Sequence, residues 1–418
     1  MANRVLERAA DNMRILSAAM VEKAKSGHPG GAMGGADFIN VLYAEFLRFD
    51  PNDMNWSFRD RFFLDPGHMS PMLYSQLHMI DKFSRDEIEN FRQWGSPTHG
   101  HPEVSVMRGI ENSSGPLGIG HAMGLGAAIA ERFYAERFGD WTSHKTYAFI
   151  SDGGMQEEIS QGVGRIAGHL GLANFIMFYD SNDIQLSHTC DHTITEDTEA
   201  KYESWGWRVE TINGNDSDEI REALKRANAE TEKPTLIIGK TVMGKGALAA
   251  DEASFEKKVS THGQPLTAAG ADMSKTIANL GGNPEDPFAV FADVKEFYAE
   301  VLVKKSEEAA EAKAVQTKWE AENADLATKM NAMLSGEEAV EVDFASMDIP
   351  DTCATRVAGG QVLANFADHY NSIIVSSADL SNSDNTGKFL DRTTELEKGN
   401  FAGPSFKLVL LNLQWLRS

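Results

Sequence analysis

The stretch YAFISDGG (residues 147–154) and the stretch FIMFYDSNDI (residues 175–184) each begin with an apolar run and end in polar residues. The runs at 147–150 and 175–179 have the length and aromatic content of buried strands, and the chain from Asp152 to about Leu170 suits a loop followed by a helix. Strand, helix and strand in this order indicate a parallel sheet that helices cover on both faces. We therefore predict an α/β fold.

The same alternation continues after this stretch and is weaker before it. A predicted helix over 218–229 precedes a predicted strand over 236–238. Residues 6–20 carry apolar residues at helical spacing. Residues 26–126 are rich in loops that contain glycine, histidine and proline, between short helices. The parallel sheet is therefore expected to lie mainly in residues 147–238.

The C-terminal part contains the beginning of a second α/β unit. A long charged helix is predicted from about residue 292 to 334, an acidic segment follows it, and a strand is predicted over 373–375. We expect three regions: a first domain (residues 1–320), a helical and acidic linker (residues 321–350) and a second domain (residues 351–418).

Composition limits the classes of function. The chain has 418 residues, of which 42% are hydrophobic and 24% charged, as in ordinary globular proteins. A net charge of -23 argues against a nucleic-acid binder, because neutralising phosphates requires clustered Lys and Arg. The two cysteines, Cys190 and Cys353, imply no disulfide framework. The N-terminus has no apolar signal stretch, and no run approaches the roughly 20 apolar residues of a membrane span, so we expect a cytoplasmic protein.

Polar residues follow both of the central strands. Asp152 comes at the end of the first strand and Asn182 at the end of the second, so both are expected at the carboxyl edge of the sheet, where ligands collect. Their oxygens can meet on one hard cation, and the backbone carbonyl of Ile184 would complete the ligands from the protein. The alternative is that Asp152 begins a turn and Asn182 caps a helix.

Asp-Gly followed by an acidic residue and then Asn after a fixed interval resembles the diphosphate and metal motif of thiamin-diphosphate enzymes. Further segments are similar to the transketolase family in particular, in the family's order and up to about Gly403. They are residues 26–30 (SGHPG), 66–68 (PGH), 100–103 (GHPE), 115–118 (GPLG), 262–266 (HGQPL), 354–356 (ATR), 377–380 (SADL) and 399–403 (GNFAG).

The resemblance implies roles for particular residues of the first domain. Thiamin diphosphate is the implied cofactor, with Mg²⁺, Ca²⁺ or another divalent cation as the metal. His28, His101 and His262 are the implied catalytic histidines, and His28 and His262 also contact the ketose. The implied metal ligands are Asp152, Asn182 and Ile184. The implied cofactor-binding residues are His68, Gly115, Pro116, Leu117, Gly153, Asn182 and His262.

The resemblance also extends into the second, pyrimidine-binding domain. Arg356 and Ser383 are the implied contacts of the sugar phosphate, which suits the forked guanidinium of Arg. Asp379 is the implied acid near the cofactor. Family sites lie between subunits, so we expect a homodimer. We also expect this domain to be truncated, with residues 404–418 an aberrant tail, because no acidic residue follows Gly403 where the family has its cofactor-activating glutamate.

The implied activity is transfer of a two-carbon ketol unit from a ketose phosphate to an aldose phosphate. Without the activating glutamate, we expect the chain alone to have little or no such activity. The alternative is a non-catalytic fragment that binds the cofactor or a full-length homologue. Cofactor-dependent turnover distinguishes the two.

Some residues depart from the family pattern or suggest another site. Ser151 stands where glycine is usual, which requires an ordinary backbone conformation there. Glu158 and Gly162 stand where the family often has Gly and Glu, although Glu157 keeps a carboxylate nearby. A separate possibility is a soft-metal site. Its alternating candidates, which would share one face of an extended segment, are His188, Cys190 and His192.

Overall fold

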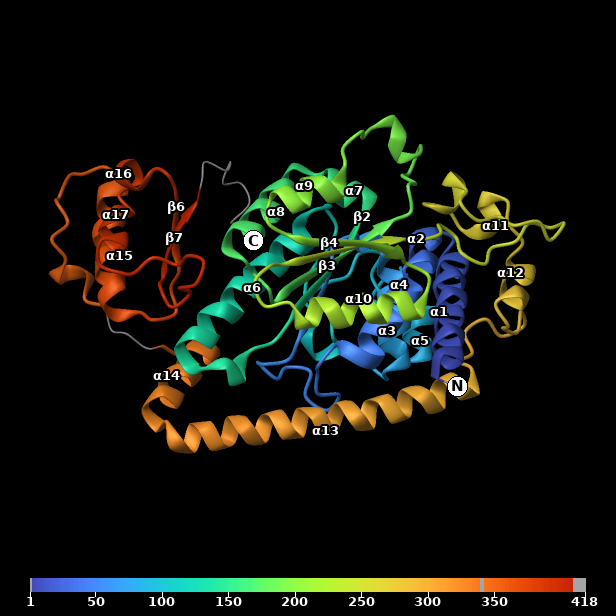
Figure 1. Cartoon of the computed structure of the whole chain (residues 1–418), viewed down its shortest axis with the longest axis horizontal. Coiled ribbons are helices and arrows are strands. Elements are labelled where there is room, and N and C mark those ends of the chain that lie inside the picture. The colour runs from blue at the N-terminus through green and yellow to red at the C-terminus, as the bar shows by residue number, and fades with distance from the viewer. Residues whose placement is uncertain (1, 339–341, 409–418) are drawn as a thin grey trace. The chain divides into compact units, whose positions relative to one another are not determined.

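The computed structural model describes residues 2–338 and 342–408. The chain forms two compact units, which are described separately (Figure 1). The first comprises the chain up to Ala128 and residues His144–Ala310, and the second comprises Ile129–Ser143 and the residues from Glu311 onward. Of the tail predicted at 404–418, residues 409–418 lie outside the described residues.

The first unit is built on a five-stranded sheet. Its strands are β1 (Arg61–Leu64), β2 (Thr146–Ser151), β3 (Phe175–Ser181), β4 (Arg208–Asn213) and β5 (Thr235–Lys240). Their order in the sheet is β1-β2-β3-β5-β4, and all neighbouring pairs are parallel. The α/β prediction is confirmed, together with the three strands predicted in this region. The sequence reasoning did not predict β1 or β4.

Helices cover both faces of this sheet. Figure 1 shows α10 (Ser217–Ala229) on one side and α8 (Glu158–Leu170) and α9 (Thr198–Ser204) on the other. One face carries a large apolar cluster shared by α1 (Ala2–Ala24), α3 (Ala36–Val41), α4 (Ser70–Met79) and α10 (Ser217–Ala229). Within this cluster Phe38 stacks on Phe178, with ring centroids 3.9 Å apart.

The opposite face meets α6 (Ile119–Phe138), where Gly124 lies against Phe63 and Phe175. Next to it, Trp207 contacts the Phe175 ring and donates a hydrogen bond to Gly164 in α8 (Glu158–Leu170). The sheet is therefore buried on both faces, which leaves its strand ends as the place for polar groups. The shorter helices of this unit are α2 (Pro29–Gly34), α5 (Arg85–Glu89), α7 (Asp152–Gln156), α9 (Thr198–Ser204), α11 (Leu266–Ala269) and α12 (Met273–Asn279).

The second unit contains a small parallel sheet. Strand β6 (Val375–Ala378) pairs with β7 (Ser405–Leu408), so the strand predicted at 373–375 lies slightly later in the chain than expected. Its helices are α14 (Ala324–Ser335), α15 (Thr355–His369), α16 (Ser381–Asp384) and α17 (Gly387–Leu390).

Helix α13 (Ala292–Glu322) runs from the first unit into the second, so the boundary predicted at residue 320 falls inside it. Among the described residues, no helix combines the length and the apolar character that crossing a membrane requires.

Candidate functional site

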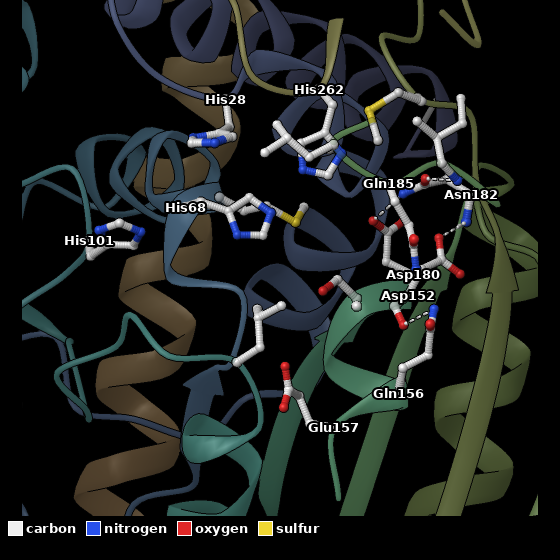
Figure 2. A pocket seen from close by; sticks show the side chains of 18 residues that line it. His28, His68, His101, Asp152, Gln156, Glu157, Asp180, Asn182, Gln185 and His262 are labelled. Atoms are coloured by element: carbon white, nitrogen blue, oxygen red, sulfur yellow. Dashed lines mark hydrogen bonds between the residues drawn. The ribbon is translucent and has the colours of Figure 1, made fainter. Parts of the chain in front are cut away.

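A cavity of about 640 Å³ opens at the carboxyl edge of the five-stranded sheet (Figure 2). Figure 2 shows four imidazoles on one side of the cavity and the polar side chains of Asp152, Asp180 and Asn182 on the other. Of the residues predicted for the site, those that line the cavity are His28, His68, His101, Leu117, Asp152, Gly153, Asn182, Ile184 and His262.

Asp152 begins α7 directly after β2 and is almost fully buried. Its Oδ2 accepts hydrogen bonds from the backbone N–H groups of Asn182 (3.2 Å) and Asp183 (3.0 Å), and its Oδ1 accepts one from the Tyr179 hydroxyl (2.5 Å). Asp183 has a left-handed backbone conformation (φ 63°), which turns the chain so that both N–H groups reach the carboxylate. Burial raises the pKa of Asp152 to about 6.

Asn182 is held by its neighbours on both sides of the amide. Its Nδ2 donates to Asp180 Oδ2 (2.9 Å), and its Oδ1 accepts from the backbone N–H of Ile184 (3.1 Å). Asp180 is fully buried and also accepts a hydrogen bond from the Thr241 hydroxyl; burial raises its pKa to about 7. Sequence reasoning did not give Asp180 a role, although it lies two residues before Asn182.

The donor set on this side fits a hard cation that also binds a phosphate. It offers one carboxylate, one amide oxygen and one backbone carbonyl, and magnesium sites of this kind use few protein ligands and fill the rest with phosphate oxygens and water. Across the described parts of the chain, no three His, Cys, Asp or Glu side chains gather in a way that could hold a metal ion by themselves. A cation here would therefore depend on further oxygens from a ligand.

Three of the predicted histidines form a cluster. The ring centroids of His28 and His68 are 4.9 Å apart, those of His68 and His262 are 5.3 Å apart, and those of His28 and His262 are 5.8 Å apart. Their loops begin or end short helices: His28 caps α2, and His262 ends a 3₁₀ turn at Val259–Thr261. The Nδ1 atoms of His28 and His262 are buried without a hydrogen-bond partner, which is typical of groups that await a ligand.

The imidazoles of the cluster are uncharged at neutral pH. Burial, reinforced by the neighbouring His262, lowers the pKa of His28 to about 4. Burial also lowers the pKa of His68, His101 and His262, and His101 is the most exposed of the four. A neutral imidazole can donate one hydrogen bond and accept another, so the cluster suits sugar hydroxyls and phosphate oxygens.

His28 should make the chain less stable in acid. Its pKa of about 4 in the folded chain lies below the ordinary value of 6.5, so between these pH values the unfolded chain binds more protons and stability falls as the pH falls. Between pH 7.5 and pH 5 the wild-type chain should lose about 2 kcal/mol more unfolding free energy than His28→Gln. Urea denaturation of both chains at both pH values measures this difference. Equal losses would mean that His28 is not held neutral.

The segment predicted to pack on the cofactor is anchored by Asp65, a residue that sequence reasoning missed. Asp65 follows β1 and is fully buried. Its Oδ2 accepts from the Gly118 N–H (3.0 Å) and its Oδ1 from the Gly120 N–H (2.8 Å), at the start of α6. These bonds position Leu117, which lines the cavity, whereas Gly115 and Pro116 do not line it. The signal available in the sequence was a carboxylate directly before Pro-Gly-His.

The family departures near Asp152 are structurally compatible with the site. Ser151 has an extended backbone (φ −97°, ψ 171°), as required, and its hydroxyl accepts a hydrogen bond from the Gly154 N–H at the start of α7. Glu157 lines the cavity with an exposed carboxylate, Glu158 is exposed, and Gly162 is buried in α8.

The residues predicted in the second domain belong to the second unit. Arg356 lies in the first turn of α15, and Ser383 lies in α16. Asp379 follows β6 and has a left-handed backbone conformation (φ 56°). Within this unit, Arg356 and Ser383 therefore lie a short distance from helix N-termini, and Asp379 lies at the end of a strand.

The three alternating candidates for a soft-metal site do not share one face. Cys190–His192 form a 3₁₀ turn and not an extended segment, so Cys190 is buried while His188 and His192 are exposed. Burial raises the pKa of Cys190 to about 12, which keeps the thiol protonated in the folded chain.

Comparison with known proteins connects this geometry to a family. Residues 5–339 match the family described as "Transketolase, thiamine diphosphate binding domain". The chain is 38% identical over 403 residues to a transketolase of Streptococcus pyogenes, covering 94% of this chain and 54% of that protein. The chain thus spans just over half the length of that relative.

Solved structures agree with the sequence match. A transketolase from Leishmania mexicana superposes with a TM-score of 0.88 at 30% identity, covering 97% of this chain and 60% of that one. A Pichia stipitis transketolase, in complex with sedoheptulose 7-phosphate, superposes with a TM-score of 0.87 at 30% identity, covering 96% of this chain and 60% of that one. The chain belongs to the transketolase family.

Proposed function

We propose that the cavity binds thiamin diphosphate together with Mg²⁺, Ca²⁺ or another divalent cation. The observation that carries this proposal is the pairing of an oxygen-donor set with a cluster of neutral histidines in one cavity, within a domain whose family is described by its binding of this cofactor. Asp152, Asn182 and the carbonyl of Ile184 would hold the cation, and His68, with Gly153, would contact the diphosphate.

The remaining cavity residues would orient the cofactor and the substrate. Leu117, held in place through Asp65, would pack on the cofactor ring beside Gly115 and Pro116. The unpartnered Nδ1 atoms of His28 and His262 support contacts from these rings to the ligand. When bound, thiamin diphosphate supplies the electron sink that lets a carbon–carbon bond next to a carbonyl break.

The proposed reaction is transfer of a two-carbon ketol unit from a ketose phosphate to an aldose phosphate. Sugar phosphates are bound by the Pichia stipitis relative in its solved complexes. In this chain, His28, His101 and His262 would bind hydroxyl groups of the ketose, because neutral imidazoles can both donate and accept hydrogen bonds. Arg356 and Ser383 would bind the phosphate, Asp379 would lie near the cofactor, and two chains would form a homodimer in the cytoplasm.

Titration calorimetry tests the binding proposal directly. Purified chain should bind thiamin diphosphate in buffer that contains Mg²⁺ and lose this binding when EDTA removes the cation. Absence of binding in the presence of Mg²⁺ would contradict the proposal.

Turnover separates a transketolase from a protein that only binds the cofactor. The assay supplies xylulose 5-phosphate and an aldose phosphate and measures the aldose product. Formation of this product that depends on both thiamin diphosphate and the cation supports ketol transfer. Cofactor binding without product formation supports the non-catalytic alternative.

A further inference from the structure

Arg92 joins two loops that carry histidines of the cavity. Its Nη1 donates a hydrogen bond to Ser26 Oγ (2.7 Å), two residues before His28. Its guanidinium also lies against the Cα of Gly100, directly before His101, so closely that a Cβ added to Gly100 would stand 2.6 Å from Arg92 Nε. One side chain thus contacts two segments more than seventy residues apart in sequence.

The backbone around Arg92 closes the loop that leads to Gly100. Arg92 has a left-handed conformation (φ 60°), which is uncommon for a residue other than glycine. Its N–H donates to the Thr98 carbonyl (2.9 Å), which closes the loop before Gly100. Helix α4 holds the same loop through two bonds: Tyr74 to the His99 carbonyl (3.0 Å) and Ser70 to the Gly100 carbonyl (2.9 Å).

The guanidinium is partly withdrawn from water, and its Nε is buried without a hydrogen-bond partner. We propose that Arg92 is a positioning residue, which fixes how His28 and His101 face the substrate side of the cavity. This role rests on the proposed function, because the orientation of these rings matters to catalysis only if they bind the ketose.

The positive charge of Arg92 acts on the same two histidines, His28 and His101, whose loops its side chain contacts. It lowers the pKa of His28 and of His101, in each case in addition to burial. His28 is also faced by His262 and His101, which lower its pKa further, and by the His68 ring at 4.9 Å. On the loop of His101, the Glu103 carboxylate accepts a hydrogen bond from Ser113 (2.8 Å). Arg92 therefore favours the neutral form of both rings.

Three variants of the full chain, measured without cofactor or substrate, test the proposal. Hydrogen exchange reports the rigidity of residues 26–28 and 98–101, and NMR of histidine ring protons reports the pKa of His28 and His101. Arg92→Gln should speed exchange about fivefold in both segments and raise both pKa values. Arg92→Lys should speed exchange similarly, because it lacks the forked guanidinium that contacts both loops. It should leave the pKa values lower than in Arg92→Gln, because it keeps the positive charge.

Gly100→Ala tests the same contact without changing Arg92 itself. Its new Cβ meets only the end of the flexible Arg92 side chain at short range, so the guanidinium should move away while the fold remains. Faster exchange at residues 26–28 in this variant would show that Arg92 links the loops. Arg226→Gln is the control, because it removes the same charge from an exposed pair with Glu210 and should leave both segments unchanged.

Unchanged exchange at residues 26–28 in both Arg92→Gln and Gly100→Ala would overturn the positioning role. Unchanged pKa values in Arg92→Gln would overturn the electrostatic part. Failure of the proposed function is seen separately, as absence of thiamin diphosphate binding by the wild-type chain.

Discussion

Asp152→Ala should weaken Mg²⁺-dependent binding of thiamin diphosphate by about 100-fold or more, which corresponds to about 2.7 kcal/mol. Asp152 is the single carboxylate of the proposed cation ligands, so the variant leaves only neutral oxygens from Asn182 and Ile184. Neutral oxygens compensate poorly for the cost of removing water from Mg²⁺. Titration calorimetry in matched buffers measures the loss.

Two further variants make this result specific. Asp152→Asn keeps an oxygen to accept the bonds from Asn182 and Asp183 but removes the charge, so its affinity should be intermediate. Asp191→Ala removes a carboxylate that is fully exposed, in the loop after Asn182, and should leave affinity unchanged.

Unfolding cannot account for a loss of binding in Asp152→Asn. Burial raises the pKa of Asp152 to about 6, so the charged form is disfavoured in the folded chain without a cation, and its neutral replacement should keep the fold at pH 7.5. An affinity equal to that of the wild type in Asp152→Ala would show that another group holds the cation, or that binding needs none.

The central strands were predictable because they are buried on both faces. Residues of β2 and β3 are apolar at nearly every position up to the strand ends, so composition alone indicates buried strands. Strand β4 lies at the edge of the sheet, and of its six residues only Ile212 is buried. An edge strand needs less apolar surface, and the sequence pattern was correspondingly too weak to predict it. Strand β1 has only four residues.

The histidines of the site were predictable because tight loops with Gly and Pro surround them, and His28, His68 and His262 do lie together. Asp65 and Arg92 were not predicted, because their importance comes from contacts far away in sequence. Asp65 directly precedes Pro-Gly-His, but in the sequence it also suits the first residue of an Asp-Pro-Gly turn. Its complete burial beneath the start of α6 decides between the two. Arg92 looks like a surface residue until its contact with Gly100 is seen.

Asp65→Ala should lower the unfolding free energy by about 3–5 kcal/mol, since it leaves buried polar groups without their charged partner. The N–H groups of Gly118 and Gly120 would lose their acceptor, and the Nδ1 of His121, 3.3 Å from Asp65 Oδ1, would lose its neighbour. Urea denaturation measures the loss, and hydrogen exchange of residues 118–128 locates it at the start of α6.

Asp216→Ala is the matched control for burial. Asp216 also accepts hydrogen bonds from two N–H groups at the start of a helix, those of Asp218 (2.9 Å) and Glu219 (3.1 Å), but these lie in contact with solvent. Water can replace the lost acceptor there, so the cost should be only about 1 kcal/mol. A cost for Asp65→Ala no larger than for Asp216→Ala would show that Asp65 is an ordinary helix cap.

The close contact between Asp65 and Gly120 links Asp65 to the cavity, because Gly120 lies at the start of the helix that follows Leu117. Gly120 lies so close to Asp65 that an added Cβ would stand 2.5 Å from its Cα, which leaves no space for a side chain between the end of β1 and the start of α6. Gly120→Ala should therefore push the helix start away from Asp65 and move Leu117 with it. If the Asp65 contact positions the cofactor-packing segment, Gly120→Ala and Asp65→Ala should both weaken thiamin diphosphate binding, whereas Asp216→Ala should not.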